Sequence, residues 1–177
     1  MTKQFYTEQI GGFEGPLQQM IRLVPDDRLD WRPADETMTV RQLTQHLIDS
    51  MRDLGAYVLA AHWIPKPIDL EKPAGKSKDD LSSELREAFA DCRMSLENVT
   101  ADDFANRQAI VADGTTPLKG TNEEVGVLLG YRHLCFHTMQ LFCYLRTLGV
   151  EADTGTLYFG LPPGQFSTRG LTEAMHA

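Results

Sequence analysis

The sequence predicts an all-α protein built from four helices with long connectors. Four stretches carry apolar residues at helical spacing, and connectors rich in proline, glycine or acidic residues separate them. The chain has 177 residues, 42% of them hydrophobic, which is enough for one buried core. We therefore expect a single domain over residues 1–177, with a helical core over about residues 2–149 and an extended tail over residues 150–177.

The first two stretches differ in regularity. Apolar residues recur from Thr2 to Val24, but three glycines and a proline within residues 11–16 interrupt them, so this helix should bend or split. A long irregular connector with two prolines follows. The second stretch runs from about Thr39 to His62, and either Thr37 or Thr39 can cap its start.

The third stretch runs from about Lys78 to Val99. Asp79 and Asp80 stand in its first turn, where negative charge stabilises the positive end of a helix dipole. The segment from Thr100 to Gly120 has no clear helical spacing. We expect it to be irregular, with room for a short hairpin around Asp113-Gly114.

The fourth stretch has the clearest boundaries. Thr121 and Glu124 have the spacing of a capping box, and Gly149 follows the last apolar residue as a C-terminal glycine does. The sequence predicts one continuous helix between them. Its expected apolar face contains Val125, Leu128, Leu129, His133, Phe136, His137, Gln140, Leu141, Tyr144, Leu145 and Leu148.

Charge and composition exclude several kinds of partner. The net charge of −8 and a pI near 5.0 argue against binding to nucleic acid or to an anionic membrane surface. The apolar runs are too short to span a bilayer, and the first residues lack the apolar core of a signal peptide. Three cysteines without a CxxC pair indicate reduced, half-buried thiols. We expect a cytoplasmic protein.

The strongest candidate site residues are His133 and His137. Residues four apart on a helix have Cβ atoms about 5–6 Å apart, so both imidazoles can reach one cation. The intervening Leu-Cys-Phe lacks the glutamate of the HExxH zinc proteases, which argues against that chemistry. The two histidines could equally be hydrogen-bonded core residues, because an unpaired buried polar group costs about 1–3 kcal/mol.

A third ligand is available on the second helix. His46 lies at the edge of that helix's apolar stripe, beside Leu47, and would face the other two histidines if the two helices are neighbours. Three protein ligands and one open position are typical of a catalytic metal site. His62, at a helix end, and His176, in the terminal tail, are poorer candidates.

Two blocks of the sequence resemble one known family. "LDWRPADETMTVRQLTQHL" (residues 29–47) is similar to the opening of the DinB/YfiT-like metalloenzymes, and "YRHLCFHTMQLFCYLRTLG" (residues 131–149) is similar to their last core helix. The second block keeps the spacing H-x-x-x-H-x-x-Q. It departs from many members at residues 138 and 139, which are Thr-Met where those members have Arg-Gly.

The resemblance implies a four-helix bundle of the DinB/YfiT type with long connections. It implies a divalent metal ion, zinc or nickel, held by His46, His133 and His137, and a homodimer. Characterised members include transferases and isomerases that use a low-molecular-weight thiol such as mycothiol or bacillithiol. We therefore expect a thiol-dependent transferase or a metal-assisted hydrolase that acts on a small molecule.

Two further residues are candidates for a supporting role, while the catalytic residues stay unknown. Asp49 could orient an imidazole as a hydrogen-bonded carboxylate, or it could be a solvated aspartate. Gln140 could hydrogen-bond near the site, or it could be an amide at the edge of the core. Two alternatives to an enzyme also remain, a metal-binding or stress-related bundle without turnover and a bundle whose histidines only pack.

Overall fold

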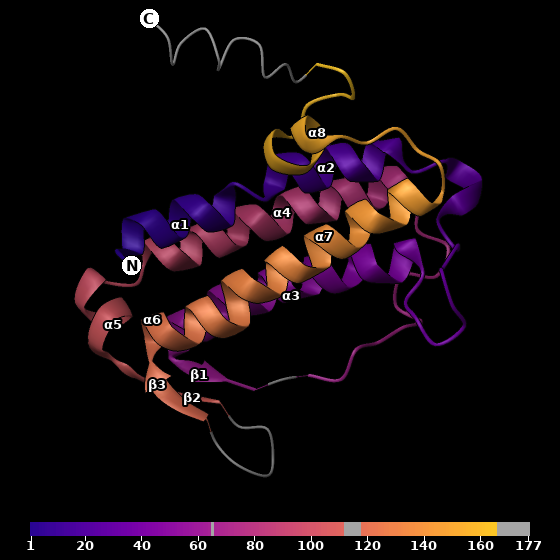
Figure 1. The fold of residues 1–177 in the computed structure, drawn as a ribbon. Coiled ribbons are helices and arrows are strands. Elements are labelled where there is room, and N and C mark those ends of the chain that lie inside the picture. The colour runs from indigo at the N-terminus through magenta and orange to yellow at the C-terminus, as the bar shows by residue number, and fades with distance from the viewer. Residues whose placement is uncertain (65, 112–117, 166–177) are drawn as a thin grey trace, which may run out of the picture.

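The structure, a computed structural model, describes residues 1–64, 66–111 and 118–165, and these residues are mostly helical (Figure 1). None of their helices is both long and apolar enough to cross a lipid bilayer. The helical elements are α1 (Lys3–Gly11), α2 (Glu14–Leu23), η1 (Asp26–Arg28), α3 (Val40–Ala60), α4 (Lys78–Glu97), α5 (Ala101–Asn106), α6 (Asn122–Val125), η2 (Gly126–Tyr131), α7 (Arg132–Thr147) and α8 (Thr154–Phe159).

The N-terminal stretch is split, as predicted. α1 ends at Gly11 and α2 begins at Glu14, with Pro16 in the first turn of α2, where its missing N–H removes no helical hydrogen bond. α1 and α2 follow one another along α4 (Figure 1). The break lets the chain change direction slightly while both helices bury apolar residues.

Capping boxes define the starts of the two long central helices. Thr39, one of the two predicted caps, accepts from the backbone N–H of Gln42, and the Gln42 side chain accepts from Thr39 N. Ser77 and Asp80 form the same reciprocal pair ahead of α4. The sequence predicts that Asp80 interacts with the helix dipole. The structure adds a hydrogen bond that the Asp80 carboxylate accepts from the backbone N–H of Ser77.

The segment between α4 and α6 is more regular than predicted. It contains α5 and two strands, β2 (Gln108–Val111) and β3 (Leu118–Thr121), which pair antiparallel. β1 (His62–Trp63) joins β2 in parallel, giving the order β1-β2-β3. The hairpin prediction therefore holds for the strands, whereas its turn around Asp113-Gly114 lies outside the described residues. The all-α prediction is corrected to a mostly helical fold with a small sheet.

The predicted fourth helix is interrupted by a π-helical segment, η2. The N–H of Arg132 bonds to the carbonyl of Val127, five residues earlier, and the phenol of Tyr6 donates to Gly126 O at 3.0 Å. A regular α-helix advances 100° per residue, so a side chain four residues further on points about 40° away from the first around the helix axis. The wider π turns offset that rotation. Buried residues here recur at every fourth position: Asn122, Gly126, Gly130, Leu134 and Thr138.

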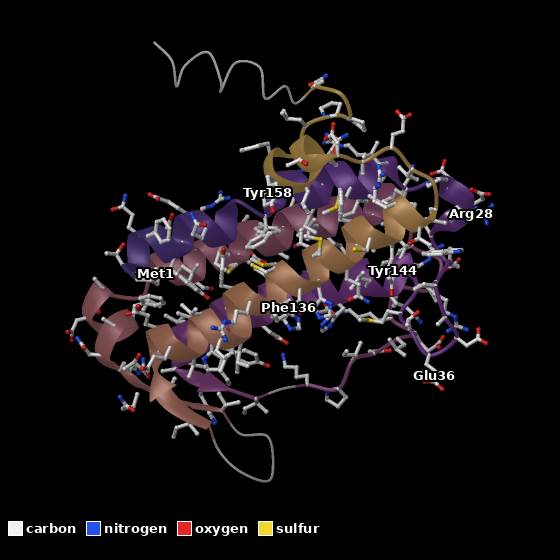
Figure 2. The ribbon with its side chains drawn as sticks, viewed as in Figure 1. Met1, Arg28, Glu36, Phe136, Tyr144 and Tyr158 are labelled. Carbon is white, nitrogen blue, oxygen red and sulfur yellow. The ribbon has the colours of Figure 1, made fainter. Side chains whose placement is uncertain are left out.

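Two residues of the expected apolar face are exposed. Phe136, labelled in Figure 2, keeps 72% of its surface accessible. Leu128 keeps 40%. The sequence places both on the apolar face because it predicts one broad stripe on a regular helix. The buried stripe of α7 is narrower and is centred on Leu134, Leu141 and Leu145.

The tail after Gly149 is partly helical and only partly extended. Gly149 has φ +76° and ends α7 as predicted, and α8 then packs against α2 and α7. Asp153 caps α8 by accepting from Thr156 N at 2.9 Å. Residues 166–177 lie outside the described part of the chain.

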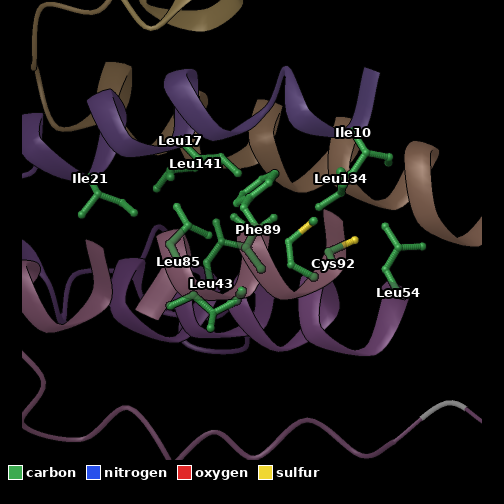
Figure 3. Packing of buried hydrophobic residues seen from close by; sticks show 14 of the residues in the cluster. Ile10, Leu17, Ile21, Leu43, Leu54, Leu85, Phe89, Cys92, Leu134 and Leu141 are labelled. Atoms are coloured by element: carbon green, nitrogen blue, oxygen red, sulfur yellow. The ribbon is translucent and has the colours of Figure 1, made fainter. Parts of the chain in front are cut away.

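The core lies among α1, α2, α3, α4 and α7, whose apolar side chains point toward one another (Figure 3). α3 and α4 make the most extensive helix pair. They approach so closely at Gly55 that a Cβ there would stand 2.9 Å from Cys92 Cα and 3.0 Å from Ser95 Cβ. The absence of a side chain at Gly55 therefore sets the distance between the two helices.

We expect Gly55→Ala to destabilise the protein by about 1–3 kcal/mol, because the new methyl group must push the backbones of α3 and α4 apart. Gly11→Ala is the matched control. A Cβ at Gly11 would meet nothing within 4 Å, so the control should unfold at the wild-type urea concentration or slightly above it. Urea unfolding followed by circular dichroism measures both. Equal stability of Gly55→Ala and wild type would contradict the close-approach explanation.

Candidate metal centre

Three histidines from two helices meet in the structure. His46 comes from α3, and His133 and His137 come from α7. The ring centroids are 4.9 Å apart for His46 and His133, 4.7 Å for His46 and His137, and 4.4 Å for His133 and His137. One nitrogen from each ring lies within 4.8 Å of the other two. The tertiary fold thus brings together the three residues that the sequence predicted as ligands.

Packing on either side of the histidines explains their convergence. His46 is flanked on α3 by Leu43 and Leu47, which are buried in the core. On α7, Leu134 and Thr138 are buried next to the two histidines. Because α3 and α7 are in contact, the residues beside their core stripes face each other across the edge of the interface. All three imidazoles are consequently half-buried.

A chain of hydrogen bonds fixes the tautomer of His137. Tyr144 donates to Met38 O at 3.2 Å, so its oxygen accepts from Gln140 Nε2 at 2.9 Å. The amide oxygen of Gln140 then lies 2.8 Å from His137 Nδ1 and accepts a hydrogen bond from its N–H. Nε2 of His137 therefore keeps its lone pair and is the nitrogen available to a cation.

Ser50 is a member of the cluster that was not predicted. Its hydroxyl donates to His46 O at 2.7 Å, and Oγ lies 3.0 Å from Nε2 of His133. Ser50 follows His46 by four residues, which places both side chains on one face of α3. That spacing is the sequence signal that could have identified it.

Burial keeps two of the imidazoles neutral. The pKa of His46 is lowered to about 4, first by loss of hydration and then by the neighbouring His137, while Asp49 opposes the shift. The pKa of His133 is lowered to about 4 by burial first, then by His137 and His46. Metal ligation requires an unprotonated ring nitrogen, so both residues are in the required state at neutral pH.

The donor set fits a divalent transition metal. Zinc is held by histidine nitrogens at about 2.0–2.1 Å, often with three protein ligands and one open position. Three neutral imidazoles also suit nickel, copper and iron. The pre-formed spacing of the nitrogens and the free lone pair of His137 agree with such a site.

Asp49 lies beside the cluster and bonds mainly to other groups. Its carboxylate accepts from Gln45 Nε2 at 3.1 Å and from Lys72, and Arg52 lies 3.7 Å away. Its action on His46 is electrostatic, since it favours the protonated imidazole. Lys72 belongs to the connector between β1 and α4, so Asp49 also ties that connector to α3.

The cluster opens into a cavity of about 740 Å³ between α3, α7 and this connector. Three ion pairs hold the described part of the connector in place: Lys66 with Asp53, Lys72 with Asp49, and Lys76 with Glu84. The apolar wall consists of Leu54, Trp63, Pro67, Ile68, Leu129 and Leu134. Charged residues, among them Arg52, Asp53 and Lys66, also line the cavity, and its volume is typical of small-molecule sites.

The remaining histidines stand apart from the cluster. His62 is exposed in β1, as expected of a poor candidate, and His176 lies outside the described residues. The three cysteines are free. Cys92 is buried, and burial raises the pKa of its thiol to about 12, while Cys143 is exposed rather than half-buried as predicted.

Comparisons with known proteins agree with this geometry. The sequence profile of the DinB superfamily matches residues 16–140, a span that includes all three clustered histidines. The crystal structure of a DinB-like protein from Bacillus subtilis is similar to the fold, with a TM-score of 0.63 at 18% identity. That match covers 81% of this chain and 91% of the other. No functionally curated protein matches the chain.

The profile match covers well over half of the chain, and the fold and the histidine cluster are consistent with it. The chain therefore belongs to the DinB superfamily, a group of metal-binding proteins.

Proposed function

We propose that the protein is a metal-dependent enzyme in which His46, His133 and His137 hold one divalent cation, zinc or nickel. The reaction we favour is thiol-dependent transfer, or hydrolysis, on a small molecule. The observation that carries the proposal is the meeting of three histidine nitrogens within 4.8 Å of one another in the lining of a 740 Å³ cavity.

The chemistry follows from the charge of the ligands. A divalent cation with an open position acts as a Lewis acid and lowers the pKa of a bound thiol or water. Because imidazoles are neutral, these ligands leave the full charge of the cation available. The apolar wall of the cavity excludes water around a bound small molecule, which strengthens electrostatic interactions there.

Gln140 and Asp49 have supporting roles in this proposal. Gln140 holds His137 in the tautomer that presents Nε2, and Tyr144 holds Gln140. Asp49 stabilises positive charge near His46 and keeps Lys72 at the cavity rim. The thiol cofactor, the homodimer, the four-helix bundle and the cytoplasmic location rest on the family resemblance or on composition, and they stay predictions.

The proposed site requires a bound metal ion. Protein purified without a histidine tag should bind about one equivalent of zinc or nickel, and His133→Ala should lose this binding because one of three ligands is gone. His62→Ala, which removes an exposed imidazole outside the cluster, should bind as the wild type does. Isothermal titration and elemental analysis measure both. Wild-type protein without stoichiometric metal would rule out the site.

The proposed enzyme should also turn over a substrate. Metal-loaded protein should transfer a low-molecular-weight thiol to an electrophile or hydrolyse a small substrate, and a chelator or His133→Ala should abolish the reaction. Stoichiometric metal without turnover across such a panel would favour the non-catalytic, metal-binding alternative.

The lowered pKa values predict how the stability of the metal-free protein depends on pH. His46 and His133 have pKa values of about 4 in the folded protein and about 6.5 when unfolded. The unfolded state therefore binds more protons between these values, and stability should fall as pH drops from about 6.5 toward 4. Urea unfolding at several pH values tests this.

The double variant His46→Gln/His133→Gln should show a flatter profile between pH 6.5 and 5, because it lacks both groups. His62→Gln serves as the control and should keep the wild-type slope. A double variant that follows the wild-type profile would show that the two imidazoles are not responsible.

Gln140 should affect metal affinity without being a ligand. Gln140→Ala removes the acceptor for His137 Nδ1–H, so we expect metal binding to weaken by about 10–100-fold. Gln140→Glu keeps an acceptor and should retain more of the affinity. Gln4→Ala, on the surface of α1, is the control. Unchanged affinity in Gln140→Ala would show that the hydrogen bond does not orient the imidazole.

A further inference from the structure

Ser50 lies against the histidine cluster and contacts His133. It is half-buried on α3, one turn after His46, and it lines the same cavity as the three histidines. Its one proton is used in the 2.7 Å bond to His46 O, so the oxygen presents lone pairs toward His133 Nε2 at 3.0 Å. In the metal-free protein, Oγ then accepts the Nε2–H of His133.

The nitrogen that Ser50 contacts is the one that we expect to face the cation. His137 must use Nε2, because Gln140 occupies its Nδ1. His133 lies one turn earlier on the same face of α7, and its side chain leaves the helix in a similar direction. The two imidazoles reach a common point most directly through the same ring atom. Ser50 Oγ therefore lies beside Nε2 of His133 on the side where the cation would bind.

We propose that Ser50 lies beside the fourth, open coordination position and accepts a hydrogen bond from the ligand that fills it. This inference rests on the proposed metal site. The 3.0 Å between Oγ and His133 Nε2 leaves the hydroxyl within hydrogen-bond reach of a ligand bound beside that nitrogen. When the cation displaces the proton of His133 Nε2, Oγ loses that donor and becomes free to accept another.

The orientation of the hydroxyl restricts the fourth ligand. Since the Ser50 proton stays on His46 O, Oγ can accept but has no proton left to donate. A ligand that keeps a proton when it binds the cation, such as water or an alcohol, gains a hydrogen bond at this position. A carboxylate would place its oxygen against the serine lone pairs without one, and a thiol, which loses its proton on binding the cation, would also gain none. Ser50 thus favours water or alcohol ligands over carboxylates and thiolates.

Cobalt substitution tests the position of Ser50 directly. In Ser50→Cys, the sulfur would be within reach of the cation, so the Co²⁺-loaded variant should show an intense thiolate-to-cobalt charge-transfer band and tighter binding. Wild type and Ser83→Cys, an exposed serine on α4, should lack the band. In Ser50→Ala, Co²⁺ affinity should stay within about 3-fold of wild type, while binding of a small alcohol to the loaded protein weakens.

A different result would overturn the inference. If Ser50 instead supports the outer nitrogen of His133, Ser50→Ala should lose about 10–100-fold in Co²⁺ affinity and Ser50→Cys should show no charge-transfer band. Nitrogen-15 spectra of the zinc-loaded protein add a second check. Metal on Nδ1 of His133 would mean that Ser50 contacts the ring nitrogen that faces away from the cation, and would overturn the inference. Failure of wild type to bind Co²⁺ at all would reject the metal site itself, which is a separate outcome.

Discussion

The close packing of α3 against its neighbours is the constraint on which the rest of the structure depends. α3 carries His46, Asp49 and Ser50, and it approaches α4 at Gly55, where no side chain could be inserted without displacing Cys92. On its other side, a Cβ at Gly130 would lie 2.5 Å from Leu54 Cδ1. Because α3 is held on both sides, its polar edge keeps a fixed position relative to α7. The histidine cluster is a consequence of that position.

The cluster carries an electrostatic cost that a metal ion would relieve. Three imidazoles with centroids less than 5 Å apart cannot all be protonated without repulsion, and burial penalises the charged form further. Neutral rings avoid this repulsion, and one nitrogen of each ring lies within 4.8 Å of the other two. Such an arrangement favours a cation. The hydrogen bonds of Gln140 and Ser50 direct the rings before any cation arrives, which lowers the entropy lost on binding.

Much of the fold could be predicted because local signals were strong. The capping boxes at Thr39 and Thr121 and the terminal glycine at Gly149 place helix ends through contacts within a few residues. The π turns before α7 could not be predicted, because the long-range contacts of Tyr6 with Gly126 and Gly130 accompany them. Phe136 was misplaced for a related reason, since apolar character alone does not say which residues a neighbouring helix covers.

The sequence by itself determined that His133 and His137 share a helix face, since a spacing of four residues is a property of the helix alone. It also identified His46 as a candidate through its place beside an apolar stripe. Only the tertiary structure decided that α3 and α7 are neighbours in the register that joins the three imidazoles, and that Ser50 and Tyr144 complete the hydrogen bonds around them. Such contacts join residues as far apart as Ser50 and His133, and they depend on core packing that no local pattern encodes.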